Sequence, residues 1–283
     1  MLEVIEDTLI DSIKLLPFLI ITYLIMEYIE HKTSNKAKDT IKKSGKFGPL
    51  IGSLLGVVPQ CGFSVSATNL YSGRVITLGT LIAVYLSTSD EMLPVMISES
   101  VSINVILEIL LIKFSIGMIV GFLIDLVLRL RHKNQEEEKI VDICEKEHCH
   151  CENGIFKSAI HHTVHIFIFI LLVSFVLNTV IFFIGEENIS MILKNQPIIG
   201  PVLSSLIGLI PNCASSVIIT EMYLENVINI GTLIAGLLVN AGVGLVVLFK
   251  TNKGIKENIK IVAILYAIGV ISGILIQLLG ITI

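Results

Sequence analysis

One stretch of the sequence occurs twice, and this duplication constrains the fold more than any other feature. Residues 56–83 read GVVPQCGFSVSATNLYSGRVITLGTLIA, and residues 208–235 read GLIPNCASSVIITEMYLENVINIGTLIA. The copies align without a gap at an offset of 152 residues, and about half of the positions from 48 to 83 are identical. Both carry Pro-x-Cys near the start. A match of this length predicts a chain built from two related structural units.

The chain is too apolar for a soluble domain. Of its 283 residues, 53% are hydrophobic and 16% are charged, and the mean hydropathy is +0.86. Soluble domains have about 25% charged residues, so we expect an integral membrane protein surrounded by lipid. The net charge of -4 argues against a nucleic-acid partner. Residues 1–7 are acidic where a signal peptide would be basic, so no signal peptide is expected before the first span.

Apolar stretches define the expected spans, since a helix needs roughly 20 residues to cross a bilayer. Five stretches qualify, at residues 9–28, 101–128, 160–183, 227–249 and 259–279, and a sixth, 75–97, qualifies if the polar break STSDEM is tolerated within it. Residues 48–72 and 200–224 are also apolar, but Pro59 and Pro211 divide them into halves too short to span. We therefore expect an all-α polytopic fold with six spans and two re-entrant helical hairpins.

Lysine and arginine cluster in three loops, which indicates the orientation of the chain. Six lysines lie between residues 32 and 46, Arg129, Arg131 and Lys133 open the central loop, and three lysines lie between residues 250 and 256. By the positive-inside rule these loops are cytoplasmic and both termini lie outside the plasma membrane. Reading each proline-cut stretch as one kinked span would put lysine-rich loops on opposite sides, and is less favourable.

This orientation gives each unit three crossings, so the second copy is inverted relative to the first. The expected organisation is a first membrane repeat at 1–129, a cytoplasmic His/Cys-rich loop at 130–158 and an inverted second repeat at 159–283. Inverted repeats are typical of secondary transporters, whose substrates bind near the bilayer midplane on broken helices. The two Pro-x-Cys turns are then predicted to be hairpin tips that approach each other from opposite faces.

The competing interpretation is that the hairpins only pack and that their cysteines are small apolar fillers. Irregular backbone at membrane depth is tolerated only where it lines a cavity or is buried in protein, which favours transport. The chain has no G-x-x-x-x-G-K-[ST] motif, so a gradient is expected to drive transport and no enzymatic activity is predicted.

The predicted substrate-binding residues lie at the hairpin tips and at three polar positions in apolar segments. Cys61 and Cys213 follow the proline breaks, where the helix dipole favours thiolate. Asp90 interrupts a span, and a carboxylate within the membrane is costly, so we expect it to face a cation or proton path unless residues 87–92 form an outer loop. Glu221 is a candidate on the same grounds, or lies near the outer headgroups. The full predicted set is Gln60, Cys61, Ser64, Asp90, Asn212, Cys213, Ser216, Glu221 and Asn240.

A second cluster of ligand types lies in the central loop, which reads DICEKEHCHCENG. Thiolate and imidazole suit Zn(II), Cu(I) or thiophilic metalloids. Adjacent residues cannot all reach one ion, so the pattern favours an accessory capture or sensing loop over a rigid site. The alternative is a polar linker with incidental cysteines. No permanently bound cofactor and, on the reducing side, no disulfide are expected. The predicted accessory ligands are Cys144, His148, Cys149, His150, Cys151 and His162.

The Pro-x-Cys hairpins, the acidic break at Asp90 and the HCHCENG loop before a His-bearing span together resemble one family. It is the family of ten-helix heavy-metal exporters, also labelled arsenic efflux proteins or manganese transporters. A looser likeness exists to the arsenical permeases. The resemblance implies efflux of a metal or metalloid ion, but the family labels disagree on which ion.

The residue types do not decide which ion is transported. Manganese prefers oxygen ligands, which Gln60, Asp90, Asn212 and Asn240 offer, whereas trivalent arsenic prefers the thiolates of the two tip cysteines. The cost of Asp90 in lipid favours a manganese-like cation. A membrane thiol-redox protein would need a C-x-x-C motif or a redox partner. An anion transporter would need basic residues at the midplane, where this interpretation places none. A homo-oligomer stays open.

Overall fold

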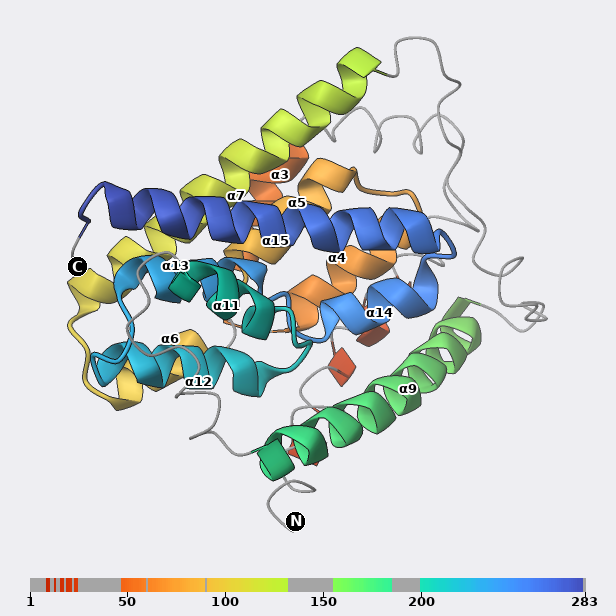
Figure 1. Ribbon diagram of the computed structural model, residues 1–283. Coiled ribbons are helices and arrows are strands. Elements are labelled where there is room, and N and C mark those ends of the chain that lie inside the picture. Colours follow the sequence, from red (N-terminus) through yellow and green to blue (C-terminus); the bar gives the residue numbers. More distant parts are fainter. Residues whose placement is uncertain are drawn as a thin grey trace.

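The computed structural model describes residues 9–10, 13, 16–17, 19–21, 23–24, 47–59, 61–89, 91–131, 155–184 and 199–281 (Figure 1). All regular structure within these residues is helical, which confirms the all-α prediction. The labelled helices are α3 (Gly48–Gly56), α4 (Gly62–Ser72), α5 (Leu78–Ser87), α6 (Met92–Ser98), α7 (Ile103–Arg131), α9 (Ile155–Ile184), α11 (Ile199–Gly208), α12 (Cys213–Leu224), α13 (Ile230–Val239), α14 (Gly244–Thr251) and α15 (Ile255–Leu278).

Four helical segments are long and apolar enough to cross a membrane. They are Ile103–Leu130, Ala159–Val176, Ile230–Thr251 and Ile255–Leu278. The outer helices α7 and α15 expose large side chains such as Leu111, Ile119, Ile271 and Leu275. Such faces are stable against lipid rather than water. The chain is therefore a polytopic membrane protein, as the sequence predicted.

The helix boundaries repeat at the spacing seen in the sequence. α5 and α13 have equal lengths and begin 152 residues apart, and α3, α4, α6 and α7 have counterparts in α11, α12, α14 and α15. In the first half α5 packs against α3 and α7, and in the second half α13 packs against α11 and α15. The two three-helix groups meet where α5 contacts α13. Both central helices are buried almost throughout, so they form the core.

Small residues allow the long outer helices to lie directly on the central ones. A methyl group added at Gly121 of α7 would lie 2.6 Å from the carbonyl oxygen of Gly79, and one added at Gly273 of α15 would lie 2.5 Å from that of Gly231. Real side chains do not make contacts that close, so glycine is required where the backbones approach. The same contact at equivalent positions shows that the packing, and not only the sequence, is duplicated.

The second helix of each hairpin packs on the other half of the chain. α4 contacts α14, and α12 contacts α6. Within each hairpin the helices also touch, α3 with α4 and α11 with α12. In Figure 1, α12 starts at the short turn that ends α11 and runs back beneath it. The long helix α9 lies apart from most of the bundle and contacts α14. The two halves are therefore interlocked through their hairpins.

Both central helices stop in the middle of the molecule and continue as short helices. α5 ends at Ser87 before α6, as the polar break in the sequence indicated, and α13 ends at Val239 before α14. The segment Ile230–Thr251 is long and apolar enough to span, as the stretch 227–249 predicted, and it is divided into α13 and α14. Asn240 accounts for the second break, because its side-chain oxygen accepts a hydrogen bond from the Gly242 amide at 2.9 Å. Gly242 adopts a φ of 52°, which glycine tolerates.

Candidate functional site

The two Pro-x-Cys turns meet at the centre of the protein. Cys61 is the N-cap of α4 and Cys213 is the first residue of α12, and their sulfur atoms lie 3.1 Å apart. Both are thiols rather than a disulfide. Cys213 is buried and Cys61 is half-buried. Pro59 and Pro211 place the cysteines here, because proline lacks an amide hydrogen and cannot continue the helix before it.

The first turn after each cysteine has the same local geometry in both copies. The Ser64 hydroxyl donates to the Cys61 carbonyl at 2.7 Å, and the Ser216 hydroxyl donates to the Cys213 carbonyl at 2.7 Å. In the second copy the side-chain oxygen of Asn212 also caps α12 by accepting from the Ala214 amide at 3.3 Å. These bonds hold the backbone that carries the thiols, so the cysteines sit on fixed helix starts.

A narrow pocket, too tight in this conformation to hold a water molecule, lies between the broken ends of the two central helices. It is lined by Thr88, Ser89, Met92, Lys113, Ser216, Leu237 and Asn240. The Asn240 amide donates to the Ser215 hydroxyl at 3.2 Å, which ties the break after α13 to the start of α12. The structure thus brings the predicted residues Ser216 and Asn240 to one pocket, three residues along α12 from Cys213.

Lys113 is the main feature that the sequence interpretation missed. It lies within α7, its side chain is fully buried, and its ammonium group donates to the carbonyl oxygen of Thr88. A positive charge is favourable at the C-terminal end of a helix, where α5 leaves its last carbonyls. The expectation of no basic residue at the midplane is therefore wrong. The signal was present, because Lys113 is the one charged residue between Glu108 and Asp125 in a predicted span, and such a charge marks a functional position.

A second polar group ties the first hairpin to the other half of the chain. The hydroxyl groups of Thr68 and Tyr85 lie 2.5 Å apart, and both lie 3.2 Å from the Gly244 carbonyl oxygen. The Thr68 hydroxyl is also 2.7 Å from the Ser64 carbonyl, so Thr68 can donate there while Tyr85 donates to Gly244 or to Thr68. A methyl group at Gly244 would lie 3.0 Å from the Ser64 hydroxyl. Helices α4, α5 and α14 are thereby fixed to one another directly beside the tip of the first hairpin.

The remaining predicted residues lie elsewhere or outside the described residues. Glu221 is exposed on α12 and does not line the pocket. His162 lies on α9, but its side chain is not among those described. Within the described part of the chain, no three His, Cys, Asp or Glu side chains come close enough to hold a metal ion together. The candidates outside the described residues are Gln60, Asp90, Cys144, His148, Cys149, His150 and Cys151.

The arrangement offers soft sulfur ligands beside a few oxygen donors and one buried ammonium group. Two thiolates on one tetrahedral soft ion lie about 3.8 Å apart, given metal–sulfur bonds of about 2.3 Å. Cys61 and Cys213 therefore need to separate by less than an ångström to share an ion. A pair of facing thiols can thus act as a two-ligand site for a thiophilic ion.

A buried core of broken helices inside a shell of lipid-facing helices defines a polytopic membrane protein with an internal polar site. The chain belongs to the family described as "Putative, 10TM heavy-metal exporter", whose model matches residues 1–185. No curated protein and no solved structure gave a significant match. The matched region ends just after α9, and the internal repeat relates the later helices α11 to α15 to it.

Proposed function

We propose that this protein is a secondary transporter that exports a thiophilic metal or metalloid ion, with Cys61 and Cys213 as paired ligands. The observation that carries the proposal is the 3.1 Å separation of their sulfur atoms across the two halves of the chain. Family membership supports the export of a heavy metal. In this scheme the central loop is cytoplasmic, both termini lie outside, and the central His/Cys residues collect the ion before transport.

Transport by alternating access fits the way in which the halves are joined. Duplicated helices that break near the middle of the membrane are typical of carriers whose two repeats rock around a central site. Each hairpin contributes one thiol and packs on the opposite half, through α4 with α14 and α12 with α6. Movement of one half against the other would change the thiol separation, so binding and movement are coupled. The inverted arrangement of the repeats is part of this proposal.

The buried lysine weakens the case for a hard divalent cation. Its ammonium group lines the same pocket as the oxygen donors of Ser216 and Asn240, and like charges repel strongly where the surroundings are poorly hydrated. An uncharged metalloid hydroxide is not repelled in this way. The thiol pair therefore supports a soft ion over the manganese-like cation that the sequence alone favoured.

A manganese-like divalent cation is the second candidate. The pocket gathers four oxygen-bearing side chains, from Thr88, Ser89, Ser216 and Asn240. Hard ions prefer such ligands, and Asp90 follows Ser89 directly in the sequence.

Two variants separate the candidates. The double substitution Cys61→Ser with Cys213→Ser removes both sulfurs and keeps the size of the side chains, whereas Asp90→Asn removes a carboxylate and keeps its shape. Cells that express each variant are compared with the parent for their content of arsenic, antimony, zinc, copper and manganese. The proposal predicts that the double serine variant loses export of a soft ion and that Asp90→Asn retains at least part of it. Loss of manganese export in Asp90→Asn alone would instead establish the second candidate.

Expression and membrane insertion of each variant are measured in parallel, since loss of the folded protein would imitate loss of transport. Parental export from both variants would overturn the proposed site and leave the hairpins as packing elements. A cell content that does not depend on the parent protein for any of these ions would overturn the proposed function itself.

A further inference from the structure

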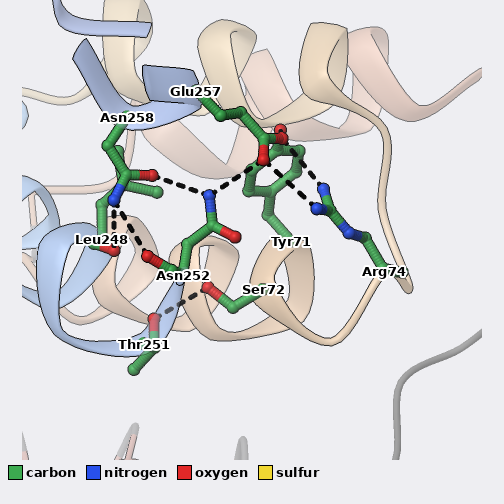
Figure 2. Close-up of polar contacts among 8 residues, drawn as sticks. All are labelled: Tyr71, Ser72, Arg74, Leu248, Thr251, Asn252, Glu257 and Asn258. Carbon is green, nitrogen blue, oxygen red and sulfur yellow. Dashed lines mark hydrogen bonds and ion pairs between the residues drawn. The ribbon is translucent and has the colours of Figure 1, made fainter. Parts of the chain in front are cut away.

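A polar cluster joins the two halves of the chain at the far end of α4 (Figure 2). The Arg74 guanidinium donates to both oxygens of the Glu257 carboxylate, at 3.0 and 3.2 Å. The Tyr71 hydroxyl also donates to Glu257, and the Asn252 amide donates to it at 3.3 Å. Ser72 and Thr251 share a further hydrogen bond of 2.7 Å. One carboxylate thus collects three partners from two separate parts of the chain.

The cluster is connected to the thiol pair by a single helix. Cys61 caps the start of α4, and Tyr71 and Ser72 lie in its last turn. The 11 residues of α4 extend about 16 Å at 1.5 Å per residue. α14 runs alongside, with Gly244 beside Ser64 and Thr251 beside Ser72. The contacts of Arg74 and Glu257 therefore close one end of an interface between the halves whose other end adjoins the thiols.

The equivalent place in the other half has no such charge pair. Asn226 takes the position of Arg74, Val105 that of Glu257 and Leu224 that of Ser72. Val105 and Tyr223 pack against the apolar core there. The equivalent positions in the two halves therefore differ in chemistry, because the ion pair of the first is replaced by Asn226 and Val105 in the second.

Arg74 has a left-handed backbone conformation that is unfavourable for arginine, and its side-chain contacts offset this cost. Arg74 has a φ of 59°, and Asn226 has a φ of 58°. This left-handed conformation follows the helix end in both copies and suits asparagine or glycine better than arginine. The first copy therefore carries arginine at a position where the backbone favours another residue. Its contacts with Glu257 and Tyr71, over which it also stacks at 5.3 Å, compensate for this.

We propose that the contacts of Arg74, Tyr71 and Asn252 with Glu257 form a latch that closes access to the thiol pair from one membrane side. The proposal rests on the proposed transport function. The membrane side that the latch closes is the one on which residues 252–254 lie. These residues include Lys253 and join α14 to α15. Opening would move the end of α4 away from α14 and α15. Arg74 and Glu257 are 23% and 34% exposed, so water can replace their contacts. Separating the apolar contacts at the opposite end would expose hydrophobic surface to water instead.

Thiol labelling tests the latch without any transport measurement. In a background with Cys144, Cys149 and Cys151 changed to serine, Cys61 and Cys213 are the remaining cysteines of the chain. The rate at which a charged, membrane-impermeant methanethiosulfonate modifies them is measured in inside-out and in right-side-out vesicles. Glu257→Gln and Arg74→Asn remove the charge pair, and Arg74→Asn also introduces the residue of the other copy.

The expected result is that the thiols are modified about 2- to 5-fold faster from the membrane side on which residues 252–254 lie. This factor corresponds to the loss of a partly exposed ion pair. The charge exchange Arg74→Glu with Glu257→Arg should return the rate toward that of the parent. Asn226→Gly, at the matching position in the other half, is the control and should leave the rate unchanged, because glycine accepts the φ of 58° at this position. Gel filtration of each variant establishes that it is folded.

Unchanged labelling in folded latch variants would overturn the proposal, as would equal acceleration from both sides or an equal effect of Asn226→Gly. These results do not depend on the transported ion. If the latch variants label faster while the parent exports none of the ions tested, these contacts do close access to the thiols, but the proposed function fails and with it the part of the latch in transport. If export depends on the thiols but labelling is unaffected, the function stands and the latch fails.

Discussion

Cys61 and Cys213 occupy equivalent positions in the two copies of the repeat, and their sulfur atoms lie 3.1 Å apart although 152 residues separate them. A residue and its own counterpart come into contact only if both lie close to the axis that relates the two copies. The thiol pair therefore marks the centre of the duplicated structure.

This contact predicts an efficient cross-link between the halves. In the background without the three central-loop cysteines, a mild oxidant such as copper phenanthroline should join Cys61 to Cys213, with two electrons passing to the oxidant and two protons released. A protease site placed in the central loop allows the halves to be separated on a gel. We expect one band before reduction and two after it. Two bands without reductant, in protein that is otherwise folded, would show that the thiols do not meet in the membrane.

Lys113 should exclude divalent cations from the pocket beside it. Lys113→Met removes the ammonium group and keeps a similar chain length, so the affinity for Mn²⁺ should rise at least about tenfold, or about 1.4 kcal/mol. Loss of the hydrogen bond to the Thr88 carbonyl should also lower stability by about 1–3 kcal/mol. Titration calorimetry and thermal unfolding in detergent measure the two effects.

The matched control for that experiment is Lys260→Met, because Lys260 is exposed on α15. This control should change neither the affinity for Mn²⁺ nor the thermal stability appreciably. Equal Mn²⁺ affinity in Lys113→Met and the parent would mean that the lysine charge does not act on an ion in this pocket.

The close approach of α7 to α5, and of α15 to α13, predicts that the matching glycines respond alike to substitution. Gly121→Ala and Gly273→Ala each place a methyl group within 2.6 Å of a carbonyl oxygen, so each should destabilise the protein by about 1–3 kcal/mol. The midpoint of thermal unfolding in detergent is the measurement. Leu123→Ala, on the exposed face of α7, should have a smaller effect. A large loss at only one of the glycines would show that the duplicated packing is not equivalent in solution.

The expected orientation can be tested with two introduced cysteines. Asn188→Cys should react with an impermeant maleimide on intact cells, whereas Asn35→Cys should react only after the membrane is opened, because the lysine-rich loop around it is expected to be cytoplasmic. A cysteine-free background is the reference. Equal reaction of both residues on intact cells would contradict the inverted arrangement.

The central loop should assist transport without forming its path. Changing Cys144, Cys149 and Cys151 to serine should lower export most at low ion concentration, where capture limits the rate, and leave it largely intact at saturation. Efflux measured over a range of ion concentrations separates these cases. Complete loss of export at every concentration, with normal expression, would place the loop in the permeation path.

Features set by local chemistry could be predicted from the sequence. Proline cannot continue a helix beyond its first turn, so Pro59 and Pro211 located both turns before the cysteines. The ungapped repeat then indicated that the two tips are equivalent. The all-helical membrane fold followed from the length and polarity of the apolar stretches, and family membership agrees with the resemblance of the motifs.

Features that depend on tertiary contacts could not be predicted in the same way. Asn240 looks like an ordinary polar residue in an apolar segment, and only its bond to the Gly242 amide shows that it ends a helix. Arg74 and Glu257 are 183 residues apart, and no local pattern pairs them. Lys113 could have been noticed from the sequence, because burying a charged side chain within a membrane span costs free energy. Its role became clear from the Thr88 carbonyl that it contacts.

The position of the cysteines has a consequence for how such a protein can vary. In an assembly of two identical half-length chains, one codon would supply both thiols, and any charge would appear at both equivalent positions at once. Fusion of the halves into one chain frees each copy to change alone. Lys113 faces the pocket where its counterpart is Leu265, and Arg74 stands where its counterpart is Asn226. The two central cysteines are still identical, whereas residues around them differ between the halves. Under the proposed function, this difference could set the direction of transport.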